Sequence, residues 1–370
     1  MKMAGFSFFR YLHFFKQMKT TDIARLRLIN QQIESPHMDS PKKLVAYMGA
    51  IQAQDYNMCK WAIGVRIADI TEKNVEAALN KGDILRTHVL RPTWHLVSSA
   101  DIYWMLELSA PQINSAMRSR SKQLELSEQL LRKTNNLIVK QLEGGKHAER
   151  DELVSAFKKA KISTDDNRAA HLLMHAELEG LICSGKMSGN KQTYALLEER
   201  VKKKNTLSRD EALATLALRY FSSHGPATLA DFTWWSGLNT KDARHALEHV
   251  KKKLHAEKLN DDTYYLPATL KLPAAVKPSV HLLPAFDEFL ISYKNRSASI
   301  LLEHHKHTIS SNGIFWPTVV VNGQVAGLWK RSIKKDKVSI ETDLFHTKPD
   351  DILLKKAIKM YGDFIGKSSI

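Results

Sequence analysis

The 370-residue sequence contains only two cysteines, Cys59 and Cys183, and they lie far apart in the chain. No Cys-x-x-Cys spacing occurs, which argues against a disulfide framework and against a structural zinc site. No run of eighteen apolar residues occurs either, so the sequence predicts no transmembrane helix. These absences favour a protein of the reducing cytosol, and we expect a cytoplasmic protein without a membrane partner.

Common catalytic and cofactor motifs are also absent. The sequence has no P-loop, no Gly-x-Ser-x-Gly and no His-Glu-x-x-His. Glu303, His304, His305 and His307 have the composition of a metal site, but adjacent histidines point apart and lack a zinc spacing. We therefore expect these four side chains to be surface residues, and we predict no metal and no cofactor.

Acidic residues are few relative to basic ones. The chain has 55 Lys plus Arg against 39 Asp plus Glu, a net charge of +16. Clustered cations release condensed counterions when they meet phosphates, so a polyanion partner explains the surplus, either nucleic acid or an anionic membrane surface. A basic protein without such a partner is the alternative. The length is sufficient for two or three separate cores.

The first residues do not form a convincing signal peptide. Arg10, His13 and Lys16 interrupt the aromatic runs, and no small-residue cleavage site follows. We expect residues 1–20 to be a disordered arm, or an extension upstream of a true start at Met18.

The next segment has the element order of a winged helix. Apolar residues recur at helical spacing from Asp22, and Ser40 with Pro41 gives a cap and first-turn signal for a second helix. A third helical segment (Asn74 to Asn80) precedes a predicted β-hairpin from Ile84 to Val97. We therefore predict a first winged-helix unit over residues 21–120.

A weak repeat with a constant offset of about 76 positions indicates two further units, over residues 121–205 and 206–268. Asp166 and Arg168 align with Asp242 and Arg244. In both copies we expect this Asp-x-Arg to open a helix, with the arginine one turn along facing a phosphate. Lys251, in a lysine run, is a further candidate for DNA contact.

The last hundred residues have a different character. Phe315 to Val321 and Gln324 to Lys330 predict a hairpin, because Asn322 and Gly323 suit a type I′ turn. We assign Lys330 and Arg331 to DNA contact. The predicted fold is α+β and mainly α: three tandem winged-helix units, then a β-containing module with a terminal helix over residues 269–370.

From about Asp22 onward the sequence resembles the AlkZ-type winged-helix DNA glycosylases, which are related to the YcaQ-like proteins. The resemblance rests on five stretches: Gln52-Ala53-Gln54; Arg91-Pro92-Thr93-Trp94-His95-Leu96-Val97; His224-Gly225-Pro226-Ala227-Thr228; Trp234-Trp235-Ser236-Gly237-Leu238; and Leu283-Pro284-Ala285-Phe286-Asp287-Glu288-Phe289. The first resembles the family's Gln, hydrophobic, Gln catalytic motif, and the second resembles its Thr-x-His segment.

The resemblance implies a monofunctional glycosylase that hydrolyses the N-glycosidic bond of alkylated purines in duplex DNA, including bulky adducts or crosslinks. Gln52 and Gln54 would position the attacking water, with Thr93 and His95 nearby and Arg91 on the DNA. A monomer would suit tandem units that surround one lesion, whereas the alternative, a winged-helix transcriptional regulator, would normally dimerise.

Several residues near the motif keep two interpretations. Asp55 either adds negative charge at the site or caps the next helix, and we favour the cap. His95 either bonds the water or a phosphate, or is a wing residue satisfied by backbone groups. Trp234 and Trp235 either stack on DNA or lie in the core, as adjacent aromatics usually do.

On an ideal helix Gln52 and Gln54 point about 200° apart, so they can share a site only if the backbone leaves the helix between them. We therefore expect the helix to end at or just after Gln52, with both side chains on a concave, DNA-facing surface.

Overall fold

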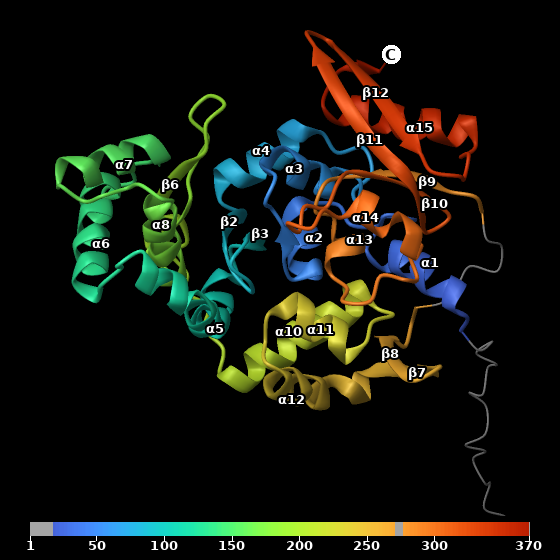
Figure 1. The fold of residues 1–370 in the computed structure, drawn as a ribbon, viewed down its shortest axis with the longest axis horizontal. Coiled ribbons are helices and arrows are strands. Elements are labelled where there is room, and N and C mark those ends of the chain that lie inside the picture. Colours follow the sequence, from blue (N-terminus) through green and yellow to red (C-terminus); the bar gives the residue numbers. More distant parts are fainter. Residues whose placement is uncertain (1–17, 271–276, 370) are drawn as a thin grey trace, which may run out of the picture.

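The computed structural model describes residues 18–270 and 277–369 (Figure 1). Most of the predicted N-terminal arm lies outside these residues. Within them, no helix is both long and apolar enough to cross a bilayer. Helices dominate, and four small sheets of two to five strands accompany them.

The first segment forms four helices and a three-stranded sheet of order β1-β3-β2. Its elements are α1 (Thr20–Asn30), α2 (Pro41–Met48), β1 (Ile51–Gln52), α3 (Tyr56–Gly64), α4 (Glu72–Lys81), β2 (Ile84–His88) and β3 (Trp94–Ser98). The Ser40 hydroxyl accepts a bond from the Lys43 amide and Pro41 occupies the first turn, as the sequence predicts. The β2–β3 hairpin is confirmed.

The expected end of the second helix is wrong. Helix α2 stops at Met48 because Gly49 takes a positive φ of 79°, which favours glycine. Gln52 therefore lies in strand β1, four residues beyond the helix. Helix α3, which the sequence patterns did not predict, follows directly. It begins at Tyr56 because the Asp55 carboxylate accepts bonds from the backbone amides of Asn57 and Met58 at 3.0 Å. Asp55 is thus a helix cap.

The long helix α5 (Ile102–Gln123) leads to two segments in which helices precede a hairpin (Figure 1). The first contains α6 (Glu128–Leu142), β4 (Ala148–Glu149), α7 (Arg150–Lys159), α8 (Arg168–Leu178), β5 (Ile182–Ser184), β6 (Thr193–Leu196) and α9 (Leu197–Arg200). The second contains α10 (Arg209–His224), α11 (Leu229–Ser236), α12 (Thr240–Val250), η1 (Lys251–Lys253), β7 (Leu254–Leu259) and β8 (Asp262–Pro267).

The Asp-x-Arg repeat falls on the helix before each hairpin, but not at equivalent positions. Asp242 lies in the first turn of α12 and Arg244 follows within the helix. Asp166 precedes α8 in a left-handed conformation, and Arg168 is the first helical residue. The expected match is thus wrong by about one turn, because an additional turn over residues 165–167 delays the start of α8.

The C-terminal segment forms a five-stranded sheet of order β13-β12-β11-β10-β9. Its elements are β9 (Val280–Leu283), α13 (Glu288–Ile291), η2 (Leu302–His304), α14 (His305–Thr308), β10 (Thr318–Val321), β11 (Gln324–Lys334), β12 (Lys337–Leu344), α15 (Asp351–Phe364) and β13 (Ser368–Ser369). The predicted hairpin is confirmed: Val321 pairs with Gln324, and Asn322 and Gly323 both have positive φ.

Two of the hydrophobic cores join segments far apart in the sequence. One core packs α2, α3 and α4 with β9, β10 and α15 of the C-terminal segment. A second packs the β2–β3 hairpin and α5 with α10, α11 and α12. The segment from α6 to β6 has a core of its own and forms a separate lobe in Figure 1. The region around β1 and β3 therefore lies where the two shared cores meet.

Candidate active site

Gln52 lies opposite His95 in an antiparallel pair. Strand β1 pairs with β3 through Ile51–Leu96 and Gln52–His95, and the Ala53 amide continues the ladder to the Trp94 carbonyl at 2.7 Å. The chain thus leaves the helix before Gln52, as a shared Gln52 and Gln54 site requires. Strand β1 ends at Gln52, and Gln54 lies in the bend that follows it.

The two glutamines differ in exposure. Gln54 is exposed, as expected. Gln52 is only 4% exposed, which contradicts the expectation that both amides face solvent. The Gln52 side-chain oxygen accepts bonds from the Arg91 guanidinium at 3.1 Å and from the Thr93 hydroxyl at 3.4 Å, so it is buried against polar groups. Gln54 is therefore the glutamine of the motif that can reach a ligand directly.

His95 is completely buried beside Gln52. Its Nδ1 lies 2.9 Å from the Thr93 carbonyl, which can only accept, so Nδ1 carries the proton and donates. Burial lowers the pKa of His95 to about 3, and the nearby positive charge of Arg91 acts in the same direction. The ring is thus neutral, and its hydrogen bond to the Thr93 carbonyl holds the backbone there in place.

The depressed pKa of His95 makes the folded state sensitive to acid. A histidine whose folded pKa lies below its ordinary 6.5 contributes stability above pH 6.5 that is lost as pH falls toward 3. In His95→Asn, whose amide nitrogen can keep the bond to Thr93, we expect the pH dependence of unfolding free energy to weaken by about 1.4 kcal/mol per pH unit between pH 5 and 6. Urea melts at several pH values would measure it, and equal slopes would contradict the buried neutral ring.

Glu288 is a fully buried carboxylate directly behind Gln52. One oxygen accepts the Gln52 backbone amide at 2.5 Å, and the other accepts the Trp235 indole at 3.1 Å and the Ser292 hydroxyl. The His224 ring lies 3.4 Å away. Burial alone would raise the pKa of Glu288, but these donors outweigh it and lower the pKa to about 2. The carboxylate is therefore ionised.

Glu288 belongs to one of the five stretches that resemble the AlkZ-type family, but the sequence alone predicts no role for it. The signal that could have singled out Glu288 is that three of the five stretches contribute side chains that meet here: His224, Trp235 and Glu288. Burial lowers the pKa of His224, and the neighbouring Glu288 carboxylate acts in the opposite direction. Burial lowers the pKa of Arg91, and the nearby negative charge of Glu288 acts in the opposite direction.

A second buried ion pair holds Glu288 in place. Arg66, fully buried on α3's C-terminal side, makes a two-pronged pair with Asp287 at 2.7 and 2.8 Å. The Asp287 carboxylate also caps α13, the short helix that begins with Glu288. Gln31 accepts from Arg66 at 2.9 Å and donates to the Tyr293 hydroxyl at 2.9 Å. Helices α1 and α13 are thereby tied together beneath the site.

The turn that carries Arg91 requires glycine at position 237. Leu90 and Gly237 both have positive φ, and a Cβ on Gly237 would lie 2.2 Å from the Leu90 carbonyl oxygen. The preceding tryptophans divide between two roles. Trp235 is buried, whereas Trp234 is 43% exposed and donates its indole to the Ile291 carbonyl at 2.9 Å.

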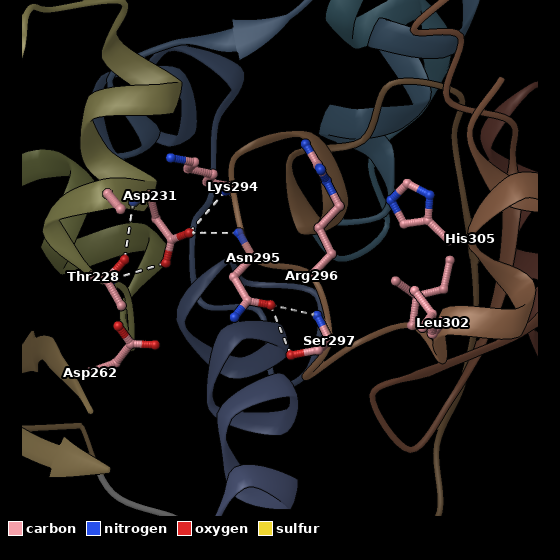
Figure 2. Close-up of a pocket in the computed structure, with 11 residues that line it drawn as sticks. Thr228, Asp231, Asp262, Lys294, Asn295, Arg296, Ser297, Leu302 and His305 are labelled. Carbon is pink, nitrogen blue, oxygen red and sulfur yellow. Dashed lines mark hydrogen bonds between the residues drawn. The ribbon is translucent and has the colours of Figure 1, made fainter. Parts of the chain in front are cut away.

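A depression of about 480 Å³ lies at the other end of α11 (Figure 2). At one side Asp231 accepts the backbone amides of Lys294 and Asn295, and His305 lies at the other side with Arg296 between them. The Arg296 guanidinium lies 5.4 Å from the centre of the exposed Trp234 ring. Burial lowers the pKa of Arg296 to about 10, and its Nη2 has no hydrogen-bond partner among the described residues.

Two of the predicted DNA-contacting residues are engaged within the protein. Arg168 donates to the Leu124 carbonyl and lies 3.9 Å from Glu125. Lys251 pairs with Glu248 one turn earlier in α12.

The other four differ in their exposure. Arg331 is half-buried and donates to the Tyr361 hydroxyl at 2.5 Å. Arg91 is also half-buried and donates to Gln52. Arg244 and Lys330 are exposed, so their charges can reach a phosphate.

Two groups of side chains have the spacing of metal ligands within the described residues. One brings together Glu303, His304 and His346; the other brings together Asp210, His245 and His249. In the first group His304 is buried and its ring stacks on Phe345 at 4.3 Å, so it is not the surface residue that the sequence predicts.

Comparison with known proteins identifies the family. Residues 45–364 match the family described as DNA glycosylase AlkZ-like. The interstrand DNA cross-link repair glycosylase of Streptomyces sahachiroi is 24% identical over 327 residues, which cover 82% of this chain and 85% of that protein. The structure of Streptomyces sahachiroi DNA glycosylase AlkZ superposes with a TM-score of 0.79 at 19% identity, covering 95% of this chain and 99% of that one.

These matches define a DNA-repair protein of the DNA glycosylase class, with DNA as its partner. In particular, the chain belongs to the AlkZ-like DNA glycosylase family, which confirms the resemblance in the sequence.

Proposed function

We propose that this chain is a monofunctional glycosylase that excises cationic, N3- or N7-alkylated purines from duplex DNA. The name of the Streptomyces relative, an interstrand DNA cross-link repair glycosylase, extends the proposal to bulky adducts and crosslinks. The observation that carries the proposal is the exposed side chain of Gln54 two residues after the buried Gln52. Gln52 accepts bonds from the half-buried Arg91 and Thr93 and has an ionised Glu288 behind it.

The chemistry requires little from the protein beyond positioning. A purine alkylated at N3 or N7 carries a positive charge and leaves as a neutral base when the C1′–N9 bond breaks, so the leaving group needs no added proton. Water adds to C1′ and releases its proton to solvent. The Gln54 carbonyl oxygen can orient that water while its amide hydrogens bond a sugar or phosphate oxygen. Normal bases, which are poorer leaving groups, would not react.

Neighbouring residues, among them the buried Glu288 and Gln52, hold this geometry in place. Glu288 holds the Gln52 amide at 2.5 Å, and Gln52 in turn holds Arg91 and Thr93. The negative charge of Glu288 in a buried setting also favours the positive charge that develops at C1′ in an oxocarbenium-like transition state. We assign Gln54 to the reacting water, and Gln52, Thr93, His95 and Glu288 to its positioning.

For the duplex we propose a path over three winged-helix units, residues 21–120, 121–205 and 206–268. Arg244 and Lys330 are predicted contacts with exposed charges, and Arg91 is a half-buried one that also donates to Gln52. Arg296 joins them, because its side chain is half-buried and one guanidinium nitrogen has no hydrogen-bond partner among the described residues, an arrangement that an anion would stabilise. Trp234 offers an exposed ring beside it. The +16 charge makes binding mainly electrostatic and weakly dependent on sequence.

The test is release of the base from duplex DNA that contains 7-methylguanine. We expect release of free 7-methylguanine, leaving an abasic strand that is cut only by later alkali, because no lyase step is proposed. Undamaged duplex should release no base. If no base is released from duplex DNA that contains 7-methylguanine, and none from a crosslinked duplex, the proposed substrate class is overturned.

The alternative regulator makes opposite predictions. A regulator would prefer one operator by several kcal/mol and would dimerise on it. The glycosylase should bind unrelated duplexes about equally, lose affinity steeply with salt and remain monomeric in light scattering.

A further inference from the structure

Asp210, His245 and His249 form a cluster that lies outside the site described above. Asp210 lies in the first turn of α10, and the two histidines lie four residues apart on α12, where positions i and i+4 share a face. The His245 Nε2 is 2.9 Å from an Asp210 carboxylate oxygen and 3.1 Å from the His249 Nε2. All three side chains are exposed.

Hydrogen bonds alone do not satisfy these contacts well. If the His245 Nε2 carries a proton, it can direct that proton at Asp210 or at His249, and it has no lone pair left to accept. If the Nε2 carries no proton, it cannot donate to the carboxylate. No single protonation state of the His245 Nε2 therefore satisfies both the Asp210 carboxylate and the His249 ring.

A metal ion satisfies all three atoms at once, because each of them offers a lone pair. Ligands at about 2.05 Å around a tetrahedral zinc lie about 3.3 Å apart, close to both observed separations. Two imidazoles with one carboxylate suit Zn²⁺, Co²⁺, Ni²⁺ or Cu²⁺ rather than Mg²⁺ or Ca²⁺. We infer that Asp210, His245 and His249 bind a divalent transition-metal ion of this class, with the remaining position open to water.

The surrounding charges leave the cluster free for a cation. Arg209, the nearest arginine in sequence, pairs with Asp242 at 2.7 Å. Lys251 pairs with Glu248. The Asp210 carboxylate therefore has no lysine or arginine partner among the described residues. A bound ion would join the start of α10 to the middle of α12 and so stabilise the segment that carries His224 and Trp235.

The sequence predicted no metal site because the ligands are distant in the chain: Asp210 and His245 are 35 positions apart. The two histidines alone form a His-x-x-x-His spacing on a helix, which without a third ligand is a weak signal.

The test is Zn²⁺ titration of the full chain after treatment with a chelator, followed by calorimetry and by thermal melting. We expect a site that raises the melting temperature by several degrees at saturation, while Mg²⁺ has no effect. Substitution of Co²⁺ should produce visible absorption bands. His249→Ala should lower Zn²⁺ affinity by more than the roughly 10–100-fold that loss of an outer-sphere partner costs, and should remove the Co²⁺ bands.

Two control variants make the result specific. His37→Ala removes another exposed histidine, and His346→Ala disrupts the group with Glu303 and His304; both should keep the site. Equal Zn²⁺ binding by the unmodified protein and His249→Ala, or loss of binding only in His346→Ala, would overturn the proposal. Absence of a Zn²⁺ effect on the unmodified protein would also overturn it. None of these readouts depends on excision activity.

Discussion

Replacement of Gln54 by alanine is expected to lower the single-turnover excision rate of 7-methylguanine by one to three orders of magnitude. The reason is that Gln54 is exposed in the bend after β1 and presents the amide that we assign to the attacking water. Loss of one group that polarises a reactant typically costs about 10²–10³-fold. Affinity for the duplex should change little, because phosphate contacts elsewhere provide most of it.

The matched control is Gln129→Ala, which removes an exposed glutamine from α6, far from β1 in the sequence. Rapid-quench kinetics with enzyme in excess gives the excision rate, and fluorescence anisotropy gives the affinity. Weakened binding of Gln54→Ala with an unchanged excision rate would show that this amide holds a phosphate and does not position water.

Replacement of Glu288 is expected to have the largest effect on stability and a large effect on excision. Both of its oxygens accept bonds from groups that can only donate, the Gln52 amide and the Trp235 indole. In Glu288→Gln one of these donors must face an amide NH₂, and in Glu288→Ala both lose their acceptor. We expect Glu288→Ala to lose about 3–5 kcal/mol of unfolding free energy, because several buried donors lose their acceptor at a cost of roughly 1–3 kcal/mol each.

The expected effect of a Glu288 substitution on excision follows from the position of Glu288 behind β1. Glu288 anchors β1 at Gln52, and a displacement of about 1 Å at a site can cost roughly 100-fold in rate. We expect Glu288→Gln to lose about that factor at a temperature where urea melts show it folded, with duplex affinity nearly unchanged. Glu128→Gln, at an exposed residue in the first turn of α6, is the control. A folded Glu288→Gln with a normal excision rate would contradict the positioning role.

The pKa of Glu288 adds a pH signature to the same experiment. An acid whose folded pKa is about 2 and whose ordinary value is 4.5 contributes stability that is complete above pH 4.5 and is lost as pH falls toward 2. Urea melts of Glu288→Gln should therefore lack the part of the acid destabilisation that falls in this window. The loss caused by His95 occurs at higher pH, between 6.5 and 3, so pH 5 to 6 reports mainly on histidine.

Local chemistry was sufficient to predict several elements from the sequence. Ser40 and Pro41 begin α2, and Asn322 with Gly323 turns β10 into β11, because caps and type I′ turns depend on a few adjacent residues. The cap by Asp55 was favoured for the same reason. The resemblance of five stretches to the AlkZ-type family, together with the excess of positive charge, pointed to a DNA glycosylase without any tertiary information.

Tertiary contacts decided the form of the site. Whether the chain at Gln52 is helix or strand depends on its pairing with His95, which is 43 positions later by residue number, and no local preference specifies that partner. The same applies to Glu288, which donors from β1, α10 and α11 keep ionised in a buried position. Sequence patterns report on neighbours within a turn or a strand pleat, whereas burial and the pKa values that follow from it depend on groups brought together only by the packing of distant segments.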